Sequence, residues 1–434
     1  MSDLLELAQG LLRAAKAAGA DVAEVGFNTG TSISVQRRLG KVEETERAEA
    51  REVGLRVFIG RCSASVSASS IDPDAFARLA EQAVEMARVV PEDPYAEIPD
   101  APAPMDASVL DLDDPDEPAM EVLIARAAAA EDAALAVPGI TNTEGASASW
   151  SRGFALHATS RGFAGLYARS NHSVSVSAIA GTGTDMQRDY DYDSVIHGAD
   201  LDDPAVLGRR AAEQALARLN PMRPSTAKLP VVYHPRIAGG ILGHLSSAIN
   251  GASIARGTSF LKDFLEKPVF GPGIRIVDDP LRVRGRRSRP YDREGLPGAM
   301  RAFIEDGVLT SWILDTRSAN QLGLKSTGNS GGTSNFYLEA GRLSPDELMA
   351  DITEGLFVTE LIGMGVNGIT GDYSRGAAGF MIRNGVLAEP VAEFTIAGNL
   401  REMFMHLTPA NDLVFKRGTD APTIRIDGMT LAGG

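Results

Sequence analysis

A proline-rich stretch between residues 91 and 104 sets the strongest limit on how this chain can fold. Its five prolines lie among acidic residues and alanines: Pro91, Pro94, Pro99, Pro102 and Pro104. Proline fixes φ and lacks an amide hydrogen, so neither a helix nor a central strand can run through this stretch. We therefore expect an extended, semi-rigid connector. A second break, Asn220-Pro221 followed by Pro224, ends the segment that follows.

The length of the chain agrees with this division. At 434 residues it is too long for one hydrophobic core, so two or three domains are expected. We predict an N-terminal α+β domain over residues 1–98, a central α+β domain over 112–222 and a β-rich C-terminal domain over 228–434. The predicted fold class is α+β, with hairpins in the N-terminal unit, a central strand meander with flanking helices, and few helices in the last domain.

The first domain is predicted to begin with an amphipathic helix. Leucine and alanine recur at helical spacing over residues 4–15, and Gly19 provides a C-terminal stop. Polar and apolar residues then alternate over residues 22–69, with a predicted hairpin turn at Gly60-Arg61. Asp72-Pro73 marks the next helix start, because aspartate caps a helix and proline suits its first position.

The same signals predict the elements of the other two domains. A strand meander is expected over residues 139–195, where polar and apolar residues alternate, and a strand over 229–233. Capping residues, prolines and apolar spacing predict further helices at 117–136, from Asp203-Pro204, from Pro235, at 344–353 and at 399–406.

Charge and cysteine content limit the classes of function. The chain carries 42 basic and 57 acidic residues, a net charge of −15 that repels nucleic-acid backbones. The single Cys62 cannot form an internal disulfide, and we interpret it as a small packing residue in a strand rather than a reactive thiol. No apolar stretch is long enough to span a membrane, and the first residues lack the pattern of a signal peptide. A cytoplasmic protein is expected.

Two charged clusters need separate interpretation. Five arginines fall within eight residues and alternate at first as on a strand face: Arg282, Arg284, Arg286, Arg287 and Arg289. We expect a solvated or ion-paired surface, with a partner contact as the alternative. Aspartates at positions 185, 189, 191 and 193 could suggest calcium, but the turn glycine and the bidentate glutamate of a calcium loop are missing. The last three are predicted to lie on a solvated strand face.

Candidate catalytic residues are few. The chain has six histidines, and no two of them lie three to five residues apart, so no local helical zinc pair exists. His244, on the helix that Pro235 opens, is interpreted as a hydrogen-bonded packing residue, with a functional role as the alternative. Lys325-Ser326 resembles a phosphate loop only superficially, because Leu324 stands where that loop requires glycine.

The glycine-rich segment over residues 361–379 is the most unusual part of the sequence. Glycine lets the backbone approach another chain or a ligand closely. The segment could therefore form a wall of a peptide groove, or it could form tight turns inside a curved sheet.

Several long motifs in the third domain identify a family resemblance. They are Gly243-His-Leu-Ser-Ser-Ala-Ile-Asn-Gly251, Gly323-Leu-Lys-Ser-Thr-Gly328, Gly363-Met-Gly365, Thr370-Gly-Asp-Tyr-Ser-Arg-Gly-Ala-Ala-Gly379 and Glu393-Phe-Thr-Ile-Ala-Gly-Asn-Leu400. With these motifs in this order, the whole chain resembles the TldD/PmbA metallopeptidase family, specifically its PmbA (TldE) branch.

The resemblance implies a division of labour between two subunits. In this family the TldD-type subunit carries a zinc-binding His-Glu-x-x-x-His helix and a later cysteine ligand, and the pair of subunits cleaves unfolded peptides. Aligned without gaps from Arg256, the zinc histidines fall at Leu242 and Ser247 and the general-base glutamate at Gly243. Aligned from Asn384, the cysteine ligand falls at Gly376. The resemblance therefore implies that this chain binds no metal and that zinc belongs to the partner.

We expect a non-catalytic subunit of a heteromeric peptidase, paired with a TldD-like partner and acting on unfolded peptides. The residues expected to face the peptide or the partner are His244, Gly363, Gly365, Asp372 and Arg375. The alternative is a homodimeric peptide-binding or chaperone-like protein. Direct action on DNA gyrase, an older description of the family, is a third hypothesis, and the negative charge argues against it.

Overall fold

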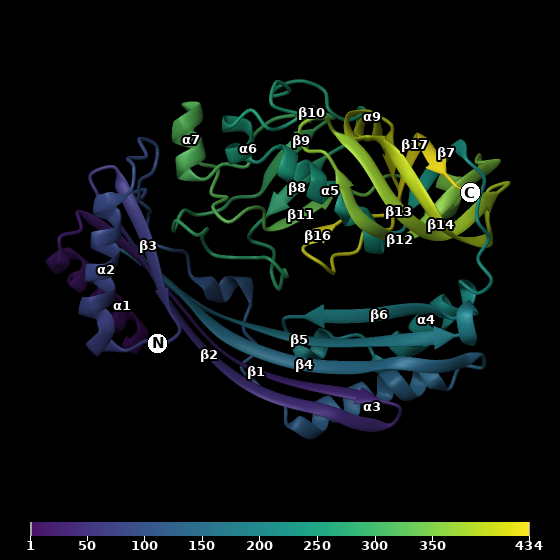
Figure 1. The fold of residues 1–434 in the computed structure, drawn as a ribbon, viewed down its shortest axis with the longest axis horizontal. Helices are drawn as coiled ribbons and strands as arrows, with labels where there is room; N and C mark the ends of the chain where they lie inside the picture. The colour runs from purple at the N-terminus through teal and green to yellow at the C-terminus, as the bar shows by residue number, and fades with distance from the viewer. Residues whose placement is uncertain (1, 434) are drawn as a thin grey trace.

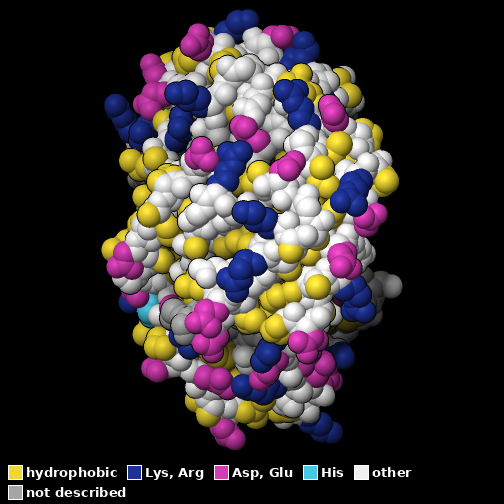
Figure 2. Space-filling view, turned by 90° about the vertical axis from the view of Figure 1, so that its left-hand side faces the viewer, with side chains coloured by type: hydrophobic (Ala, Val, Ile, Leu, Met, Phe, Trp, Pro, Cys, Tyr) yellow, Lys and Arg dark blue, Asp and Glu magenta, His cyan; other side chains and the backbone are white. Residues whose placement is uncertain are grey.

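The computed structural model describes residues 2–433, and the predicted α+β fold class is confirmed. Figure 1 shows a long curved sheet with helices on its outer face, and a β-rich domain that lies against its concave side. No helix among the described residues is long and apolar enough to cross a membrane. On the face in Figure 2, acidic and basic side chains are interspersed, and Lys and Arg side chains follow one another down its middle.

The curved sheet and its helices form the first half of the chain. The α-helices are α1 (Ser2–Ala18), α2 (Phe76–Val89), α3 (Met120–Leu135) and α4 (Pro204–Ala217). The strands are β1 (Val22–Arg38), β2 (Lys41–Ile59), β3 (Cys62–Ala68), β4 (Ile140–Thr159), β5 (Ala164–Ala180) and β6 (Gln187–Val195). Short 3₁₀ turns are η1 (Pro73–Ala75), η2 (Ala107–Leu110), η3 (Gly183–Asp185) and η4 (Gly198–Asp200).

The predicted N-terminal and central domains share one six-stranded sheet, in the order β3-β2-β1-β4-β5-β6. Antiparallel pairing of β1 with β4, for example Val25 with Ala158, makes this join. Because side chains alternate along a strand, one face of β1 packs on both helix pairs. Phe27 lies in the core under α1 and α2, whereas Val35 lies in the core under α3 and α4. The other face of the sheet is left for the third domain.

The proline-rich connector contains no helix or strand from Val90 to Asp106, as predicted. It is held against the third domain by side chains of one short helix, α7 (Thr316–Leu322). Arg317 Nε lies 2.6 Å from Asp93 Oδ2, and Asn320 Nδ2 donates to the Tyr95 carbonyl at 3.0 Å. The connector is therefore fixed to a part of the chain more than two hundred residues away.

The third domain combines a closed barrel with a second sheet. The strands β14-β13-β12-β7-β17-β15 form one sheet, and additional pairing of β14 with β17 closes it. These strands are β7 (Ala227–Tyr233), β12 (Glu354–Val366), β13 (Asp372–Arg383), β14 (Val386–Asn399), β15 (Leu407–Pro409) and β17 (Ile424–Ala432). The second sheet contains β8 (Ile276–Asp279), β9 (Arg301–Glu305), β10 (Val308–Leu309), β11 (Asn335–Leu338) and β16 (Thr419–Asp420).

Helix α5 (Pro235–Ala248) packs into the core that joins the barrel to the second sheet. In Figure 1 it lies between β8 and β11 on one side and β13 on the other. The remaining helices of this domain are α6 (Gly251–Ala255), α8 (Pro345–Met349) and α9 (Leu400–Met405). The helix predicted at 344–353 is shorter than expected, because Ile352 already bonds through its amide to the Met349 carbonyl as the chain turns towards β12.

The prediction of a solvated aspartate face on β6 is wrong. Asp189 and Asp193 are each only 3% exposed, because α4 and the third domain cover this face. Asp189 pairs with Arg218 and Arg236, and Asp193 lies 3.5 Å from the ammonium group of Lys416. Over residues 2–433 no group of three potential metal-binding side chains is found. The aspartates hold the two halves of the molecule together.

The arginine-rich segment does not form the expected strand face. Residues 281–289 form consecutive turns, and Arg284 adopts a left-handed backbone conformation with φ of 52°. The Arg284 amide donates to the Leu110 carbonyl at 2.8 Å, so the segment bonds to the first half of the chain rather than to a strand neighbour. The Arg284 side chain is ion-paired, as predicted, with Asp111 and Asp200.

Candidate functional site

Helix α5 carries Leu242, Gly243 and Ser247, three of the four positions that the resemblance assigns to the zinc ligands and the general base. Its start is fixed by Pro235 and by His234, whose Nδ1 accepts a hydrogen bond from the Arg236 amide at 3.1 Å. One face of the helix is buried, including Ile241 and Leu245. Two glycines leave part of the opposite face bare: a side chain added at position 240 or 243 would meet no neighbouring atom.

The four positions that the resemblance assigns to the zinc site carry no set of donors that fits a zinc ion. Leu242 is 1% exposed and belongs to the hydrophobic core. The exposed Ser247 donates its hydroxyl to the Gly243 carbonyl one turn earlier, at 2.9 Å. Gly376, on β13, faces Ile362 across the β12–β13 pair. Hydrolytic zinc needs about three strong nitrogen, sulfur or carboxylate ligands, which leucine, glycine and serine do not provide.

His244 lies one turn after Gly240 on α5, and its ring faces β13. Its ring packs edge-on against Tyr373, with the ring centroids 5.8 Å apart, and the positive charge of Arg375 acts on the imidazole. Burial, and next the charge of Arg375, lower the pKa of His244 below its ordinary value, so the ring is neutral at physiological pH. The structure thus brings His244 near Tyr373 and Arg375 of β13, in a packing arrangement.

The glycine-rich segment forms a hairpin between β12 and β13. Gly363 has φ of +80° at an irregularity in the strand register, a conformation that favours glycine. A Cβ atom at Gly365 would lie 2.1 Å from the Ser374 carbonyl oxygen. Three hydrophobic side chains of the hairpin are exposed: Ile362 (60%), Met364 (89%) and Ile369 (64%). The segment therefore makes tight backbone approaches and also presents an apolar surface.

Asp372 supports the rim of a cavity in the third domain. Its carboxylate accepts hydrogen bonds from Thr370 Oγ1 at 2.7 Å and from Asn399 Nδ2 at 3.2 Å, and these bonds, that of Thr370 first, lower its pKa. Both donors line a cavity of about 580 Å³. Its wall combines apolar and polar side chains: Leu261, Phe264, Pro268, Val269, Thr370, Asn399, Arg401, Glu402, Met405 and His406.

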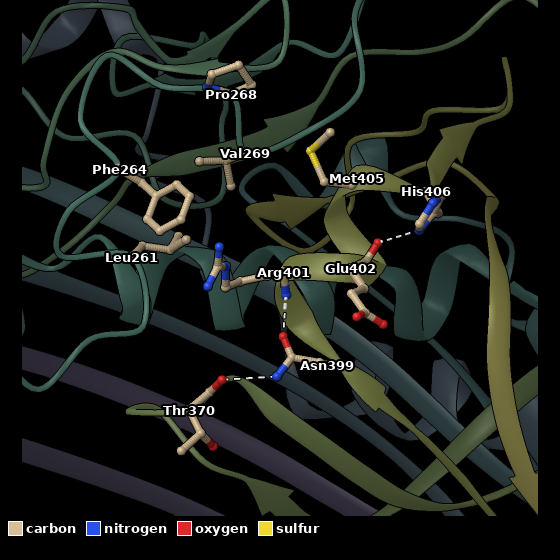
Figure 3. Close-up of a pocket in the computed structure, with 10 residues that line it drawn as sticks. All are labelled: Leu261, Phe264, Pro268, Val269, Thr370, Asn399, Arg401, Glu402, Met405 and His406. Carbon is tan, nitrogen blue, oxygen red and sulfur yellow. Dashed lines mark hydrogen bonds between the residues drawn. The ribbon is translucent and has the colours of Figure 1, made fainter.

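Figure 3 shows how these side chains are arranged. The guanidinium of Arg401 lies over the Phe264 ring, 4.5 Å from its centroid, and its amide is capped by Asn399 Oδ1. His406 is hydrogen-bonded through Nδ1 to the Glu402 carbonyl at 2.9 Å. No side chain here forms a nucleophile–base pair, so the cavity is suited to holding an apolar side chain beside a polar edge. The sequence indicated only that a helix lies here, and nothing in it revealed the cavity.

A second set of cavities lies between the curved sheet and the third domain. Three of them, of about 470, 530 and 340 Å³, adjoin one another. The first two share Tyr167 and Arg289, and the last two share Gly26, His157 and Arg293. We call this set the interdomain cleft. Ser246 of α5 lines its first cavity, so the cleft reaches that helix.

Comparison with protein families gives three matches that follow one another along the chain. Residues 23–87 match the model of "PmbA/TldA metallopeptidase domain 1", residues 113–219 its central domain and residues 226–433 its C-terminal domain. Together these matches cover most of the sequence.

Individual proteins match over the full length. The chain is 39% identical to metalloprotease PmbA of Escherichia coli O157:H7, and the alignment covers 100% of this chain and 95% of that protein. A Bacteroides thetaiotaomicron structure, described as a candidate modulator of DNA gyrase, has a TM-score of 0.89 at 24% identity and full coverage of both chains. TldE from Thermococcus kodakarensis has a TM-score of 0.85 at 19% identity, covering 98% of this chain and 100% of that one. At these identities the two structures show a shared fold.

Proposed function

The chain belongs to the PmbA/TldD metallopeptidase family, and from that premise we propose that it is the non-catalytic subunit of a heteromeric peptidase. In this proposal a TldD-like partner carries the zinc ion, and the pair cleaves unfolded peptides in the cytoplasm. The family resemblance predicted from the motifs of the third domain is confirmed by the matches.

The observation that carries the proposal is the chemistry of α5. Three of its aligned positions hold Leu242, Gly243 and Ser247, and the fourth position, on β13, holds Gly376. None of these offers an imidazole, thiolate or carboxylate, and His244 points towards Tyr373 instead. A subunit that has the fold of the family but lacks these donors can contribute a binding surface, while a partner subunit performs the metal chemistry.

The shape of the molecule supports a peptide as the substrate. The interdomain cleft is built from several adjoining cavities rather than one enclosed pocket. One of its walls is the concave face of the curved sheet, with small residues such as Gly26 and Gly54. An extended chain fits such a cleft better than a compact small molecule does.

The experiment is to purify this chain alone, the TldD-like partner alone, and both together, and to measure cleavage of an unstructured fluorogenic peptide. We expect chelator-sensitive cleavage by the mixture and none by this chain, and zinc by elemental analysis only in the partner. Chelator-sensitive cleavage by this chain alone, with bound zinc, would disprove the proposal.

A homodimeric peptide-binding protein is the second candidate, favoured by the apolar hairpin surface of Ile362, Met364 and Ile369. An exposed apolar patch marks an interface in many proteins. Co-purification separates the two candidates: a heteromeric peptidase gives a stoichiometric TldD-like protein, whereas the alternative gives self-association alone.

Direct action on DNA is the third candidate, and its motivation is weak. Of the clustered arginines, Arg284 is ion-paired and Arg282 lies over the Phe415 ring, 3.4 Å from its centroid. A gel-shift assay at physiological salt is expected to show no binding.

A further inference from the structure

Four arginines line the cavity at the α5 end of the interdomain cleft, and no carboxylate of residues 2–433 is paired with them. They are Arg169 from β5 and three members of the arginine-rich segment, Arg286, Arg287 and Arg289. Among residues 2–433, their side chains donate to carbonyl groups or, for Arg287, to the hydroxyl of Thr419. Arg284, in the same segment but outside this cavity, has two carboxylate partners.

The carboxylates nearest to these arginines are already engaged elsewhere. The charges of Asp292 and Asp278 raise the pKa of Arg289, but neither carboxylate forms an ion pair with it. Asp292 accepts hydrogen bonds from three backbone amides, and Asp278 from Asn329 and from one backbone amide. Burial raises the pKa of both carboxyl groups, that of Asp278 to about 6. The charges of Asp193 and Asp420 likewise raise the pKa of Arg286 without forming an ion pair with it. These groups do not neutralise the cavity.

Three of these arginines are partly buried and Arg287 is exposed, and none has a carboxylate partner among residues 2–433. Burial is the largest cause of a lowered pKa at Arg169, Arg286 and Arg289. By contrast, the pKa of Arg236 is raised although it is also buried, because Asp189 lies beside it. Arginine stays protonated in either case. A partly buried charge without an anionic partner is less stable than a paired one, so the cavity favours an anion that enters it.

The guanidinium groups have donors left for such an anion. Arg169 makes three hydrogen bonds, to the carbonyls of Gly285, Arg286 and Ser288. Arg289 makes two, and Arg286 makes one at 3.5 Å. Each guanidinium has five N–H groups, arranged in a planar fork that suits a carboxylate. The bonds already made hold the arginines in place, which reduces the entropy lost on binding.

The rest of the cleft has the character of a peptide site. Tyr291, 6% exposed, lines the middle cavity, and its buried hydroxyl has no hydrogen-bond partner among residues 2–433. Its ring packs edge-on against Tyr167 with centroids 5.6 Å apart. Glu24 and Asp292 also line the cleft beyond the arginines. Glu24 is ion-paired with Arg56, and Arg293 lines the same two cavities, so acidic and basic groups are mixed there, whereas the charged residues that line the α5 end are all arginines, which suits a carboxylate.

We propose that the cavity around Arg169, Arg286 and Arg289 binds a carboxylate group of an extended peptide lying in the interdomain cleft. The carboxylate can be that of a C-terminus or of an acidic side chain. This rests on the proposed function only in taking the ligand to be a peptide. It assigns to this chain a selective role, the capture of peptides by their negative charge.

The test measures direct binding to the purified full chain by fluorescence anisotropy, without the partner. The probe is a labelled unstructured peptide that ends in glutamate with a free C-terminus. Two further peptides separate the sources of the carboxylate: one has an amidated C-terminus, and one has glutamine in place of glutamate. A peptide with both changes is expected to bind at least about tenfold more weakly, as for loss of a charge-assisted hydrogen bond.

The variant is Arg286→Gln, because Arg286 makes fewer hydrogen bonds to the protein than Arg169 or Arg289 does. Its matched control is Arg284→Gln, which removes the same charge from the same segment outside the cavity. We expect Arg286→Gln to weaken binding about tenfold and the control to bind like the unaltered chain. Circular dichroism of both variants checks that they are folded.

Equal binding of the charged and uncharged peptides, or equal binding by the two variants, would overturn the proposal. So would displacement of the peptide by inorganic phosphate where acetate has no effect, or tighter binding of a single-stranded oligonucleotide at physiological salt. Binding does not depend on catalysis. Carboxylate-dependent binding without cleavage in the presence of the partner would refute the proposed function alone, and cleavage without carboxylate-dependent binding would refute this inference alone.

Discussion

Asp189 of β6 and Arg236 of α5 form an ion pair across the junction between the curved sheet and the third domain, with Arg236 Nη2 2.6 Å from Asp189 Oδ1. Asp189 also accepts a hydrogen bond from Arg218 Nη1, at 3.2 Å. The two guanidinium side chains are 10% and 13% exposed. One buried carboxylate thus pairs with two arginines and ties the first turn of α5 to the sheet, and Glu360 of β12 provides a second counter-charge for Arg218.

Replacing Asp189 by asparagine is expected to destabilise this junction by about 3 kcal/mol, since Arg236 loses its carboxylate partner and Arg218 keeps only Glu360. Urea denaturation followed by fluorescence measures the loss. The matched control is Asp191→Asn, two residues further along β6. Its partner Arg210 is 40% exposed, so the expected loss is below about 1 kcal/mol. Equal losses in the two variants would contradict the role given to Asp189.

His234 makes the start of α5 sensitive to acid. Burial, and then the charges of Arg236 and Arg417, lower its pKa to about 4, from 6.5 in an unfolded chain. The folded pKa is depressed, so the contribution of neutral His234 is present above pH 6.5 and is lost as the pH falls towards 4. Its Nδ1 must also be unprotonated to accept from the Arg236 amide.

We expect the native protein to lose about 2 kcal/mol between pH 7 and pH 5 relative to His234→Asn. Asparagine keeps an acceptor at the helix start but does not titrate. Thermal unfolding of both proteins at the two pH values measures this difference. A constant difference between them would show that His234 does not titrate in this way.

Glu294 is expected to give the opposite pH dependence. Burial raises its pKa to about 7, even though Thr316 donates to it through both its amide and its hydroxyl. The folded pKa lies above the unfolded value of 4.5, so the stabilisation is complete below pH 4.5 and is lost as the pH rises through 7.

Between pH 5 and pH 8 the native protein should lose about 2 kcal/mol relative to Glu294→Gln, which retains an acceptor for Thr316. Thermal unfolding at both pH values, in buffers of equal ionic strength, provides the measurement. If Glu294→Gln shows the same pH dependence as the native protein, another group is responsible.

Gly365 is expected to be intolerant of any side chain. The Cβ atom of Gly365→Ala would lie 2.1 Å from the Ser374 carbonyl oxygen, so β12 and β13 must separate there. We expect a loss of about 1–3 kcal/mol and faster hydrogen exchange in this hairpin. Gly368→Ala is the control, because the space beside Gly368 is open. Normal stability and exchange in Gly365→Ala would disprove the close approach.

Local signals in the sequence were sufficient for most elements. Asp203 caps α4 and Asp72 caps the turn before α2, as the Asp-Pro pairs predicted. Gly19 ends the first helix region with φ of +107°. These features depend on residues a few positions apart, so the sequence carries them directly. The absence of metal donors at Leu242, Gly243, Ser247 and Gly376 also follows from the sequence, given the family resemblance.

Tertiary structure alone decided how the segments meet. The pairing of Val25 with Ala158 unites two predicted domains in one sheet, and it joins strands more than one hundred residues apart. The same long-range packing buries Asp189, which the alternating pattern placed in solvent, and gathers Arg169 with Arg289 at one cavity. Periodicity shows which side chains share one face of a helix or strand. Which segment packs against that face depends on the burial of residues far apart in the sequence. The interdomain cleft of this protein lies where such distant segments meet.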